Sequence, residues 1–268
     1  MIDHGKYNVL SIRIDAVDYD AAVERIVDAA QSQRPMAVSA LAVHGVMTGA
    51  LDPVHRYRLN QFELLVPDGQ PVRWALNWLY RIKLNERVYG PQLMLCLCEQ
   101  AAQMELPIFL FGGTAELLTA LQTNLLRKYP GLKIAGTRPS QFRRLSTNER
   151  QEIVADIKSS GARIAFVGLG CPRQEVWAYE FKNHLSMPIL AVGAAFNFHA
   201  GKLSQSPTWL QERGLEWAYR LALEPRRLWK RYLLLNPLYL TMLFMQFSRL
   251  KAFNPNQAVQ PTEELLYG

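Results

Sequence analysis

Short apolar runs alternate with amphipathic segments through the first 200 residues of the chain. Runs of about four to eight aliphatic and aromatic residues predict strands, and apolar residues that recur every three or four positions predict helices. We expect strands at Tyr7–Ile14, Met36–Val43, Phe62–Val66, Pro107–Phe111, Leu132–Thr137, Arg163–Val167 and Pro188–Val192.

Helical signals fill the segments between these strands. The segment Asp18–Gln33 places Val23, Ile26 and Ala30 on one face. Further helices are expected from His44 to about Asp52-Pro53, at Thr114–Tyr129, after Ser146 with Glu149 at the spacing of a capping box, and from Pro172. Strands that alternate with helices indicate an α/β fold with a doubly wound, mainly parallel sheet.

The pattern changes after residue 200. The segment Pro207–Arg231 is rich in Trp and Arg, and Tyr232–Phe247 is dominated by Leu, Met, Phe and Tyr but interrupted by Asn236-Pro237. The tail from Asn254 is polar, and we expect it to be frayed. The chain therefore divides into a body (1–205), a basic, amphipathic helical appendage (206–251) and a polar tail (252–268).

The composition indicates a cellular compartment, and the distribution of charge indicates a type of partner. Hydrophobic residues make up 49% of the chain, which is enough for a sizeable core, and three cysteines suit a reducing cytoplasm better than a disulfide framework. The N-terminus shows no secretory signal. Of the net charge of +7, the segment from Arg213 to Lys251 carries +6. Such a localised patch indicates an anionic partner: phosphates, an acidic lipid surface or nucleic acid.

The arginines of the appendage have a helical spacing. Arg220, Arg227 and Arg231 are seven and four residues apart, so a single helix would place them on one face, where they could grip a diphosphate. A solvated cationic face is the alternative. The apolar stretch beside them is too short and interrupted to span a bilayer, so we expect an interfacial anchor. A core helix or the interface of a homo-oligomer is the alternative.

In a doubly wound sheet, ligands bind beyond the carboxyl ends of the strands. The residues just past predicted strands are therefore candidates, and the first is Asp68 in Pro67-Asp68-Gly69. A carboxylate there can act as general base for an acceptor hydroxyl. The alternative is an Asx-turn, or an N-cap for a helix that starts at Pro71.

Glycine-rich turns follow two of the other strands, at Gly112-Gly113 and at Gly168-Leu169-Gly170. Glycines let backbone amides approach an anion, and the helix that begins near Pro172 favours a phosphate at its N-terminus. Gln174 and Glu175 in its first turn can hydrogen-bond a sugar or a base. The spacing matches neither a dinucleotide fingerprint nor a P-loop, and a plain strand-to-helix turn is the alternative.

The sequence predicts no metal site and no cofactor. Asp18-Tyr19-Asp20 has the spacing of a metal–diphosphate pair but opens a helix, so we expect a helix cap. The five histidines show no paired metal-ligand spacing. His44 and His199 follow strands and can contact an acceptor, but a core or surface role is the favoured alternative for each. Cys171 has no base partner nearby in the sequence, which argues against a nucleophile.

Four ordered motifs point to one family. They are Pro67-Asp68-Gly69, Gly168-x-Gly-x-Pro-Arg-Gln-Glu175, the Gly193–Gly201 stretch, and Glu216-Trp-x-Tyr-Arg220 with Glu224-Pro-x-Arg227. Together they resemble the WecG/TagA/CpsF glycosyltransferases over roughly residues 7 to 247. The resemblance implies a Rossmann-like, metal-independent, inverting hexosyltransferase that uses a UDP-sugar. The implied acceptor is a polyprenyl-diphosphate-linked sugar at the cytoplasmic face of the inner membrane, in exopolysaccharide biosynthesis.

The resemblance also assigns roles. The family's catalytic aspartate falls on Asp68, and an arginine before the helix that begins near Gly90 falls on Arg87. The implied donor and phosphate contacts also include Arg173, Gln174 and Glu175, together with Arg220, Arg227 and either Lys230 or Arg231. In the family the appendage contacts the membrane and completes the active site over the diphosphate.

Two motifs depart from the family pattern. Many members have Thr-x-Asn after the second strand, where this chain has Ser39 through His44, and many have Phe-Asp where this chain has Phe196-Asn197. These positions correspond to acceptor contacts (Ser39, His44) and a donor contact (Asn197). The departures favour the branch that adds a β-1,4-linked glucose in xanthan-like polysaccharides over an N-acetylmannosaminyl- or N-acetylmannosaminuronyltransferase.

Two other classes of protein compete with this interpretation. A dehydrogenase-like enzyme can use the same sheet architecture, but Gly-x-Gly-x-x-Gly is missing after the first strand. A nucleic-acid binder would account for the basic segment, but here the charge lies beside a long apolar run rather than among exposed polar residues. We therefore expect no nucleic-acid partner.

Overall fold

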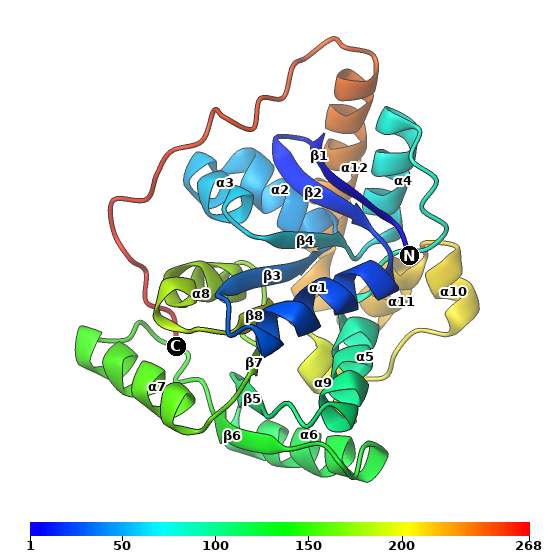
Figure 1. The fold of residues 1–268 in the computed structure, drawn as a ribbon. Coiled ribbons are helices and arrows are strands. Elements are labelled where there is room, and N and C mark those ends of the chain that lie inside the picture. Colours follow the sequence, from blue (N-terminus) through cyan, green and yellow to red (C-terminus); the bar gives the residue numbers. More distant parts are fainter.

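The computed structural model describes the backbone of residues 1–268 and every side chain except those of Arg227 and Arg231. The phosphate contacts expected of those two arginines therefore lie outside the described residues. The body is a six-stranded parallel sheet with helices on both faces (Figure 1). The strand order is β4-β3-β8-β7-β5-β6, formed by Leu64–Pro67, Met36–Leu41, Pro188–Ala191, Ile164–Val167, Ile108–Phe111 and Ile134–Arg138. The predicted fold class is confirmed.

Two hydrophobic cores lie on opposite faces of the sheet because successive strand residues point in opposite directions. In β4, Leu64 and Val66 belong to one core and Leu65 to the other. The first core is covered by α1 (Tyr19–Gln31), α5 (Gly90–Gln103), α6 (Ala115–Lys128) and α9 (Ala195–His199). The second is covered by α2 (Val43–Leu51), α3 (Pro53–Asn60), α4 (Gln70–Tyr80), α7 (Thr147–Ser159) and α8 (Arg173–Phe181).

The prediction of one strand at Tyr7–Ile14 is wrong. The chain forms an antiparallel hairpin of β1 (Asp3–Val9) and β2 (Ile12–Val17), joined at Leu10 and Ser11. Both turn residues have positive φ, 52° and 73°, as a two-residue hairpin turn requires. The usual Asn-Gly or Asp-Gly signal is missing, so the apolar pattern continues through the turn and conceals it.

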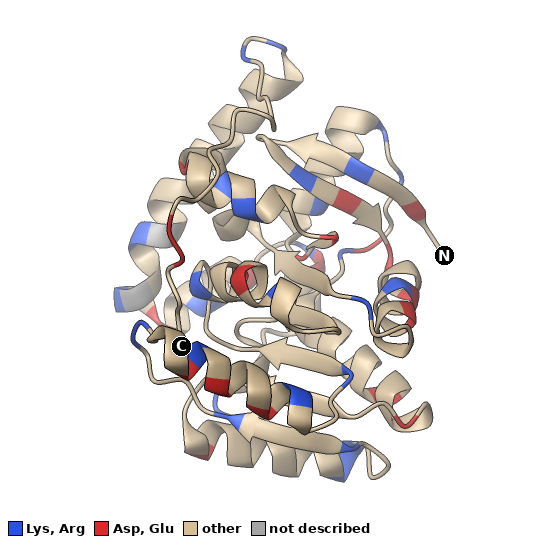
Figure 2. Cartoon of the chain, turned by 60° about the vertical axis from the view of Figure 1, so that its left-hand side comes forward, with Lys and Arg blue, Asp and Glu red and all other residues tan. Residues whose placement is uncertain are grey.

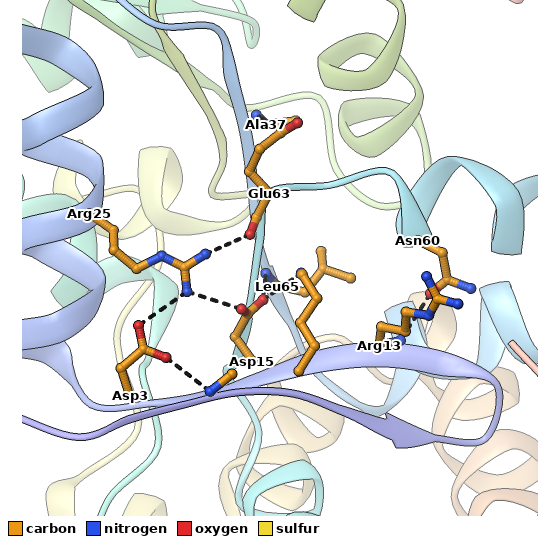
Figure 3. A network of polar contacts seen from close by, with 10 residues as sticks. Asp3, Arg13, Asp15, Arg25, Ala37, Asn60, Glu63 and Leu65 are labelled. Atoms are coloured by element: carbon orange, nitrogen blue, oxygen red, sulfur yellow. Dashed lines mark hydrogen bonds and ion pairs between the residues drawn. The ribbon is translucent and has the colours of Figure 1, made fainter. Parts of the chain in front are cut away.

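A buried carboxylate fixes this hairpin against the edge of the large sheet (Figure 3). Asp15 is 1% exposed and accepts hydrogen bonds from the Leu65 backbone N–H at 2.8 Å and from Lys6 Nζ at 2.7 Å. Arg25 donates to Asp15 and to the carbonyl of Glu63. The backbone of β4 thus finds partners on its outer side, which covers an otherwise open sheet edge.

The appendage consists of α10 (Thr208–Glu212), α11 (Glu216–Leu223) and α12 (Pro225–Phe247). Two expectations about it are wrong. Arg220 shares no continuous helix with Arg227 and Arg231, because the chain leaves helical geometry at Glu224 (φ −131°, ψ 57°). Asn236-Pro237 does not end the apolar helix, although Pro237 has no N–H to donate to the preceding turn.

Helix α12 is docked on one side only. Tyr239 is buried and donates its hydroxyl to the carbonyl of Pro71, and Leu228 and Leu243 are buried too. This anchorage through the second core holds the helix together across its proline. In the part of the chain that the structure describes, the helices lack a continuous apolar stretch of the length that a bilayer span requires.

The tail is not frayed, contrary to expectation. It runs from the end of α12 down one side of the body to a point beside α8 and α7 (Figure 1). Val259 donates its N–H to the Pro53 carbonyl, and the N–H groups of Leu265 and Leu266 both donate to the buried carboxylate of Glu180. Composition alone concealed these backbone contacts, since they need no apolar side chain.

Candidate active site

A cavity of about 830 Å³ opens at the carboxyl ends of the parallel strands. The turns after β3, β4, β5, β7 and β8 form its floor, and α11 and α12 close over it. Of the predicted site residues whose side chains the structure describes, ten line it: His44, Asp68, Arg87, Gly113, Gly168, Gly170, Gln174, Glu175, Asn197 and Arg220. The general-base candidate and the arginine helix, far apart in sequence, therefore meet in one cavity.

Asp68 lies at the end of β4 and contacts the start of a different helix. Its carboxylate accepts the N–H of Gly90, the first residue of α5, at 2.8 Å. It does not cap α4, whose N-cap is Gly69. Burial raises the pKa of Asp68 to about 6, and Glu216 adds to this rise, while Arg87, the Gly90 hydrogen bond and Arg220 oppose it. A carboxylate with such a pKa is ionised at neutral pH and still basic enough to accept a proton.

Arg87 ties the appendage to the body. Its guanidinium donates to Glu216 Oε2 at 2.7 Å and to Gln211 Oε1 at 3.0 Å, and lies 4.3 Å from the centre of the Tyr89 ring. The Tyr89 hydroxyl donates to the other carboxylate oxygen of Glu216 at 3.2 Å. The side chains of Arg87 and Glu216 are only 11% and 14% exposed, so their ion pair is protected from screening by salt. Arg87 thus holds an acid of the appendage next to Asp68.

Arg220 projects from α11 into the cavity. Its guanidinium lies 6.0 Å from the centre of the Phe198 ring, and its Nε is buried without a hydrogen-bond partner among the described residues. A buried donor without an acceptor is costly, so this geometry favours an anionic ligand. Lys230 of α12 also lines the cavity. Among the described side chains of the appendage, Arg220 and Lys230 thus line the cavity opposite its floor.

Glu175 sits at the centre of a buried hydrogen-bond network. It is 1% exposed and accepts the Ser39 hydroxyl at 3.0 Å and the Gln174 side-chain amide at 2.9 Å. Burial raises the pKa of Glu175, while hydrogen bonds from Gln174, Ser39 and Cys171 lower it. Gln174 in turn accepts the N–H of Gly170. This network fixes the glycine-rich turn after β7.

Three predicted contacts lie off the cavity wall. Ser39, expected to meet the acceptor, is fully buried behind the wall and supports Glu175 instead. Gly112, at φ +110°, packs against Gly168, and a Cβ there would lie 2.9 Å from the Gly168 carbonyl group. Arg173 is exposed and lies 5.5 Å from the centre of the Tyr267 ring. Their roles in this structure are support and packing.

Sequence reasoning missed several residues of the wall. Tyr89, Glu216, Trp217 and Phe142 all line the cavity. Glu216 could have been found from its place in the Glu-Trp-x-Tyr-Arg motif, because an acid among so many cations calls for a partner. Phe142 carries no local signal, since it lies in an irregular loop after β6.

The remaining candidates have structural partners. Asp18 caps α1, as predicted, by accepting the N–H of Ala21. His199 Nε2 lies 2.9 Å from the Pro91 carbonyl, and burial lowers the pKa of the ring. Among the described residues, no three His, Cys, Asp or Glu side chains come together in a way that could hold a metal ion.

A carboxylate with a raised pKa, cavity-facing cations and glycine turns lie together at the carboxyl ends of a doubly wound sheet, an arrangement that suits group transfer from a phosphate-activated donor. The sequence profile of the Glycosyl transferase WecG/TagA/CpsF family matches residues 7–252. The chain belongs to this family and is a glycosyltransferase.

A curated relative carries a more detailed description. The chain is 26% identical over 208 residues to the N-acetylglucosaminyldiphosphoundecaprenol N-acetyl-beta-D-mannosaminyltransferase of Bacillus subtilis (strain 168). The aligned region covers 77% of this chain and 78% of the relative, so it includes most of the cavity.

Proposed function

We propose that the protein transfers a sugar from a nucleotide-sugar donor to a sugar carried on a polyprenyl diphosphate, with inversion and without a metal. The observation that carries this proposal is the convergence of Asp68 and Arg220 on one cavity. Its floor of glycine turns suits phosphates, and the relative's name describes an acceptor that is a lipid diphosphate sugar.

Asp68 acts as the general base in this mechanism. It accepts the proton of the acceptor hydroxyl while that oxygen attacks C1 of the donor sugar from the face opposite the leaving group. The hydrogen bond from Gly90 and the charge of Arg87 keep the carboxylate oriented and ionised. Its raised pKa, about 6, leaves it a stronger base than an ordinary aspartate.

Arg220 and Lys230 stabilise the departing nucleoside diphosphate. Negative charge develops on the bridging oxygen as the C1–O bond breaks, and preorganised cations in a closed site stabilise it without reorganisation. The unpartnered Nε of Arg220 supplies a donor for this purpose. The appendage is then part of the chemistry as well as a cover.

The relative shifts the expected donor sugar. The sequence departures at Ser39 through His44 and at Phe196-Asn197 favoured glucose. Of these residues, Ser39 lies behind the cavity wall, whereas His44 and Asn197 line the cavity. The relative's name, however, describes N-acetylmannosaminyl transfer. We therefore propose an N-acetylmannosaminyl nucleotide, with UDP as the nucleotide, as the favoured donor. Glucose transfer is the alternative.

The appendage also carries the proposed membrane contact, at the cytoplasmic face of the inner membrane. Basic residues of α12 are confined to its N-terminal half, and the rest of the helix carries no charge (Figure 2). Large apolar side chains on its outer side are left exposed: Leu233, Leu234, Leu240, Phe244 and Phe247, followed by Leu250. Apolar side chains beside cations suit the interface of an anionic bilayer, where the lipid-linked acceptor resides.

The test is direct. The purified protein is incubated with UDP-N-acetylmannosamine, UDP-glucose or UDP-N-acetylglucosamine and short-chain prenyl-diphosphate acceptors that carry N-acetylglucosamine or glucose, and the products are identified by mass spectrometry. We expect transfer from UDP-N-acetylmannosamine to the N-acetylglucosaminyl lipid. Transfer from UDP-glucose alone would replace the donor assignment. No transfer and no UDP binding would overturn the proposal.

A further inference from the structure

The polar tail (252–268) is attached at its end to a loop that borders the cavity of the candidate active site. Its last residues pair with the loop after β6: the Leu145 N–H donates to the Leu266 carbonyl at 2.7 Å, and the Gly268 N–H donates to the Arg143 carbonyl at 3.0 Å. Arg144 and Tyr267 form an antiparallel bridge between these contacts. The family profile ends at residue 252, so this attachment lies outside the region that the family match covers.

The same loop presents an aromatic ring to the cavity. Phe142 lines the cavity yet is 57% exposed, and it lies after the edge strand β6. Its backbone has φ +55°, a conformation that a bulky residue keeps only when its surroundings impose it. Here Ser140 imposes it, because its hydroxyl accepts the Phe142 N–H at 2.9 Å and donates to the Gly268 main-chain oxygen at 2.6 Å.

A second residue next to the cavity is held by the tail. Arg173 opens α8, directly after the glycine turn, and its guanidinium faces the ring of Tyr267. One salt bridge and two hydrogen bonds hold the residues just before Tyr267: Arg150 pairs with Glu264, and Glu180 accepts the backbone N–H groups of Leu265 and Leu266. The tail therefore braces both the Phe142 loop and the start of α8.

Phe142 lies at the opposite end of the cavity from Asp68. Asp68 follows β4 at one edge of the sheet, whereas Gly113 follows β5 and Phe142 follows β6 at the other edge. Four strand spacings from β4 to β5 amount to roughly 20 Å. If the sugar of the donor lies at Asp68 and its phosphates over the glycine turns, the nucleobase is the part of the donor that reaches the far end.

We propose that Phe142 is the stacking platform for the nucleobase of the donor, and that the tail is a strap that holds this platform in position through Ser140, Tyr267 and Gly268. This inference rests on the proposed nucleotide-sugar function. An exposed aromatic ring at the rim of a polar cavity suits a nucleobase, because every base has a flat π-face that can stack on it.

The test separates the platform from the strap. Phe142→Ala should raise the KM for the nucleotide sugar and the Kd for UDP roughly tenfold or more, with kcat and the KM for the lipid acceptor nearly unchanged. Inhibition by inorganic pyrophosphate, which has no base, should keep its wild-type constant. Phe142→Trp restores the aromatic face and should restore UDP affinity. An equal loss for pyrophosphate and UDP, or unchanged UDP binding, would overturn the platform.

Ser140→Ala and Tyr267→Ala test the strap without touching the ring. Both should raise the KM for the donor and the Kd for UDP in the direction of Phe142→Ala, and neither should add a further loss when combined with it. Thr123→Ala, on α6 away from the loop, is the matched control. Fully additive losses would show that the tail acts elsewhere and would overturn the strap.

The possible outcomes also distinguish a failure of this inference from a failure of the proposed nucleotide-sugar function on which it rests. A wild-type protein that binds no UDP and uses no nucleotide sugar removes the proposed function and, with it, the platform. If the wild-type protein binds UDP and transfers sugar, but Phe142→Ala has the same donor KM, the platform alone is overturned. Two further variants keep the inference testable if Phe142→Ala unfolds. A Ser140→Ala variant with the donor KM and UDP Kd of the wild type would overturn the strap. A Phe142→Leu variant with unchanged UDP affinity would overturn the platform.

Discussion

The two ends of the cavity are built in different ways. At the Asp68 end, charged side chains from the body and the appendage meet, and one buried ion pair, Arg87 with Glu216, holds them together. At the Phe142 end, glycine turns and backbone hydrogen bonds shape the wall. The difference matches the role proposed for each end: proton transfer and leaving-group departure need positioned charge, whereas recognition of a nucleotide needs close backbone approach and a flat apolar surface.

The largest expected effect is at the Asp68 end. Asp68→Asn keeps the size of the side chain but removes the base, so transfer should fall by about 10²–10⁴-fold. UDP affinity should stay within about twofold, because the proposed position of the nucleotide is at the other end. Product formation and isothermal titration with UDP measure the two quantities. A variant with most of its turnover would remove Asp68 from the base role.

Arg220 supplies the next largest effect. Arg220→Ala should lower kcat by about 10²–10³-fold, since it removes a preorganised cation from the leaving group. Arg220→Lys should recover part of this loss. Arg213→Ala is the matched control, because Arg213 is exposed beside Trp209 and does not line the cavity. Equal kcat values for Arg213→Ala and Arg220→Ala would show that only the net charge of the appendage matters.

The outer face of α12 is expected to contribute binding rather than chemistry. Leu234→Asp combined with Phe244→Asp should weaken binding to vesicles with anionic lipids by about tenfold or more, since each change takes an exposed apolar side chain out of the interface. Activity on a water-soluble short-chain acceptor should persist. Thr123→Asp, exposed on α6 and away from α12, is the control for added charge. Vesicle sedimentation checks the prediction.

The smallest expected effect is on the pH dependence of kcat, which tests whether Asp68 and Glu216 interact electrostatically as proposed. With Asp68 as base and a pKa of about 6, kcat should fall as pH drops through about 6 because the carboxylate becomes protonated. Glu216 raises that pKa, so Glu216→Gln should move the acid limb to lower pH. It should also lower kcat modestly, since Arg87 loses its ion-pair partner. A limb that stays in place or moves to higher pH would show that another group controls it.

The pattern of the sequence was sufficient for the strands and most helices of the body. Each strand is a short apolar run followed by a turn, and the rule that ligands bind at the carboxyl ends of such strands located Asp68, Gly113, Gly168 and Gln174. The sequence pattern did not predict the hairpin turn at Leu10-Ser11, because this turn lacks the residues that usually mark one. The sequence pattern also did not predict that the helix continues through Pro237. A proline predicts a break in a helix unless packing holds the helix together.

The sequence by itself determined the fold class, the strand ends and the chemical types gathered there, because hydrophobic periodicity and turn residues are local properties. Only the tertiary structure decided which charges meet. It paired Arg87 with Glu216, placed Ser39 behind the wall and brought the tail to the Phe142 loop. These contacts join residues more than a hundred positions apart, and nothing in the local sequence around any of them specifies the partner.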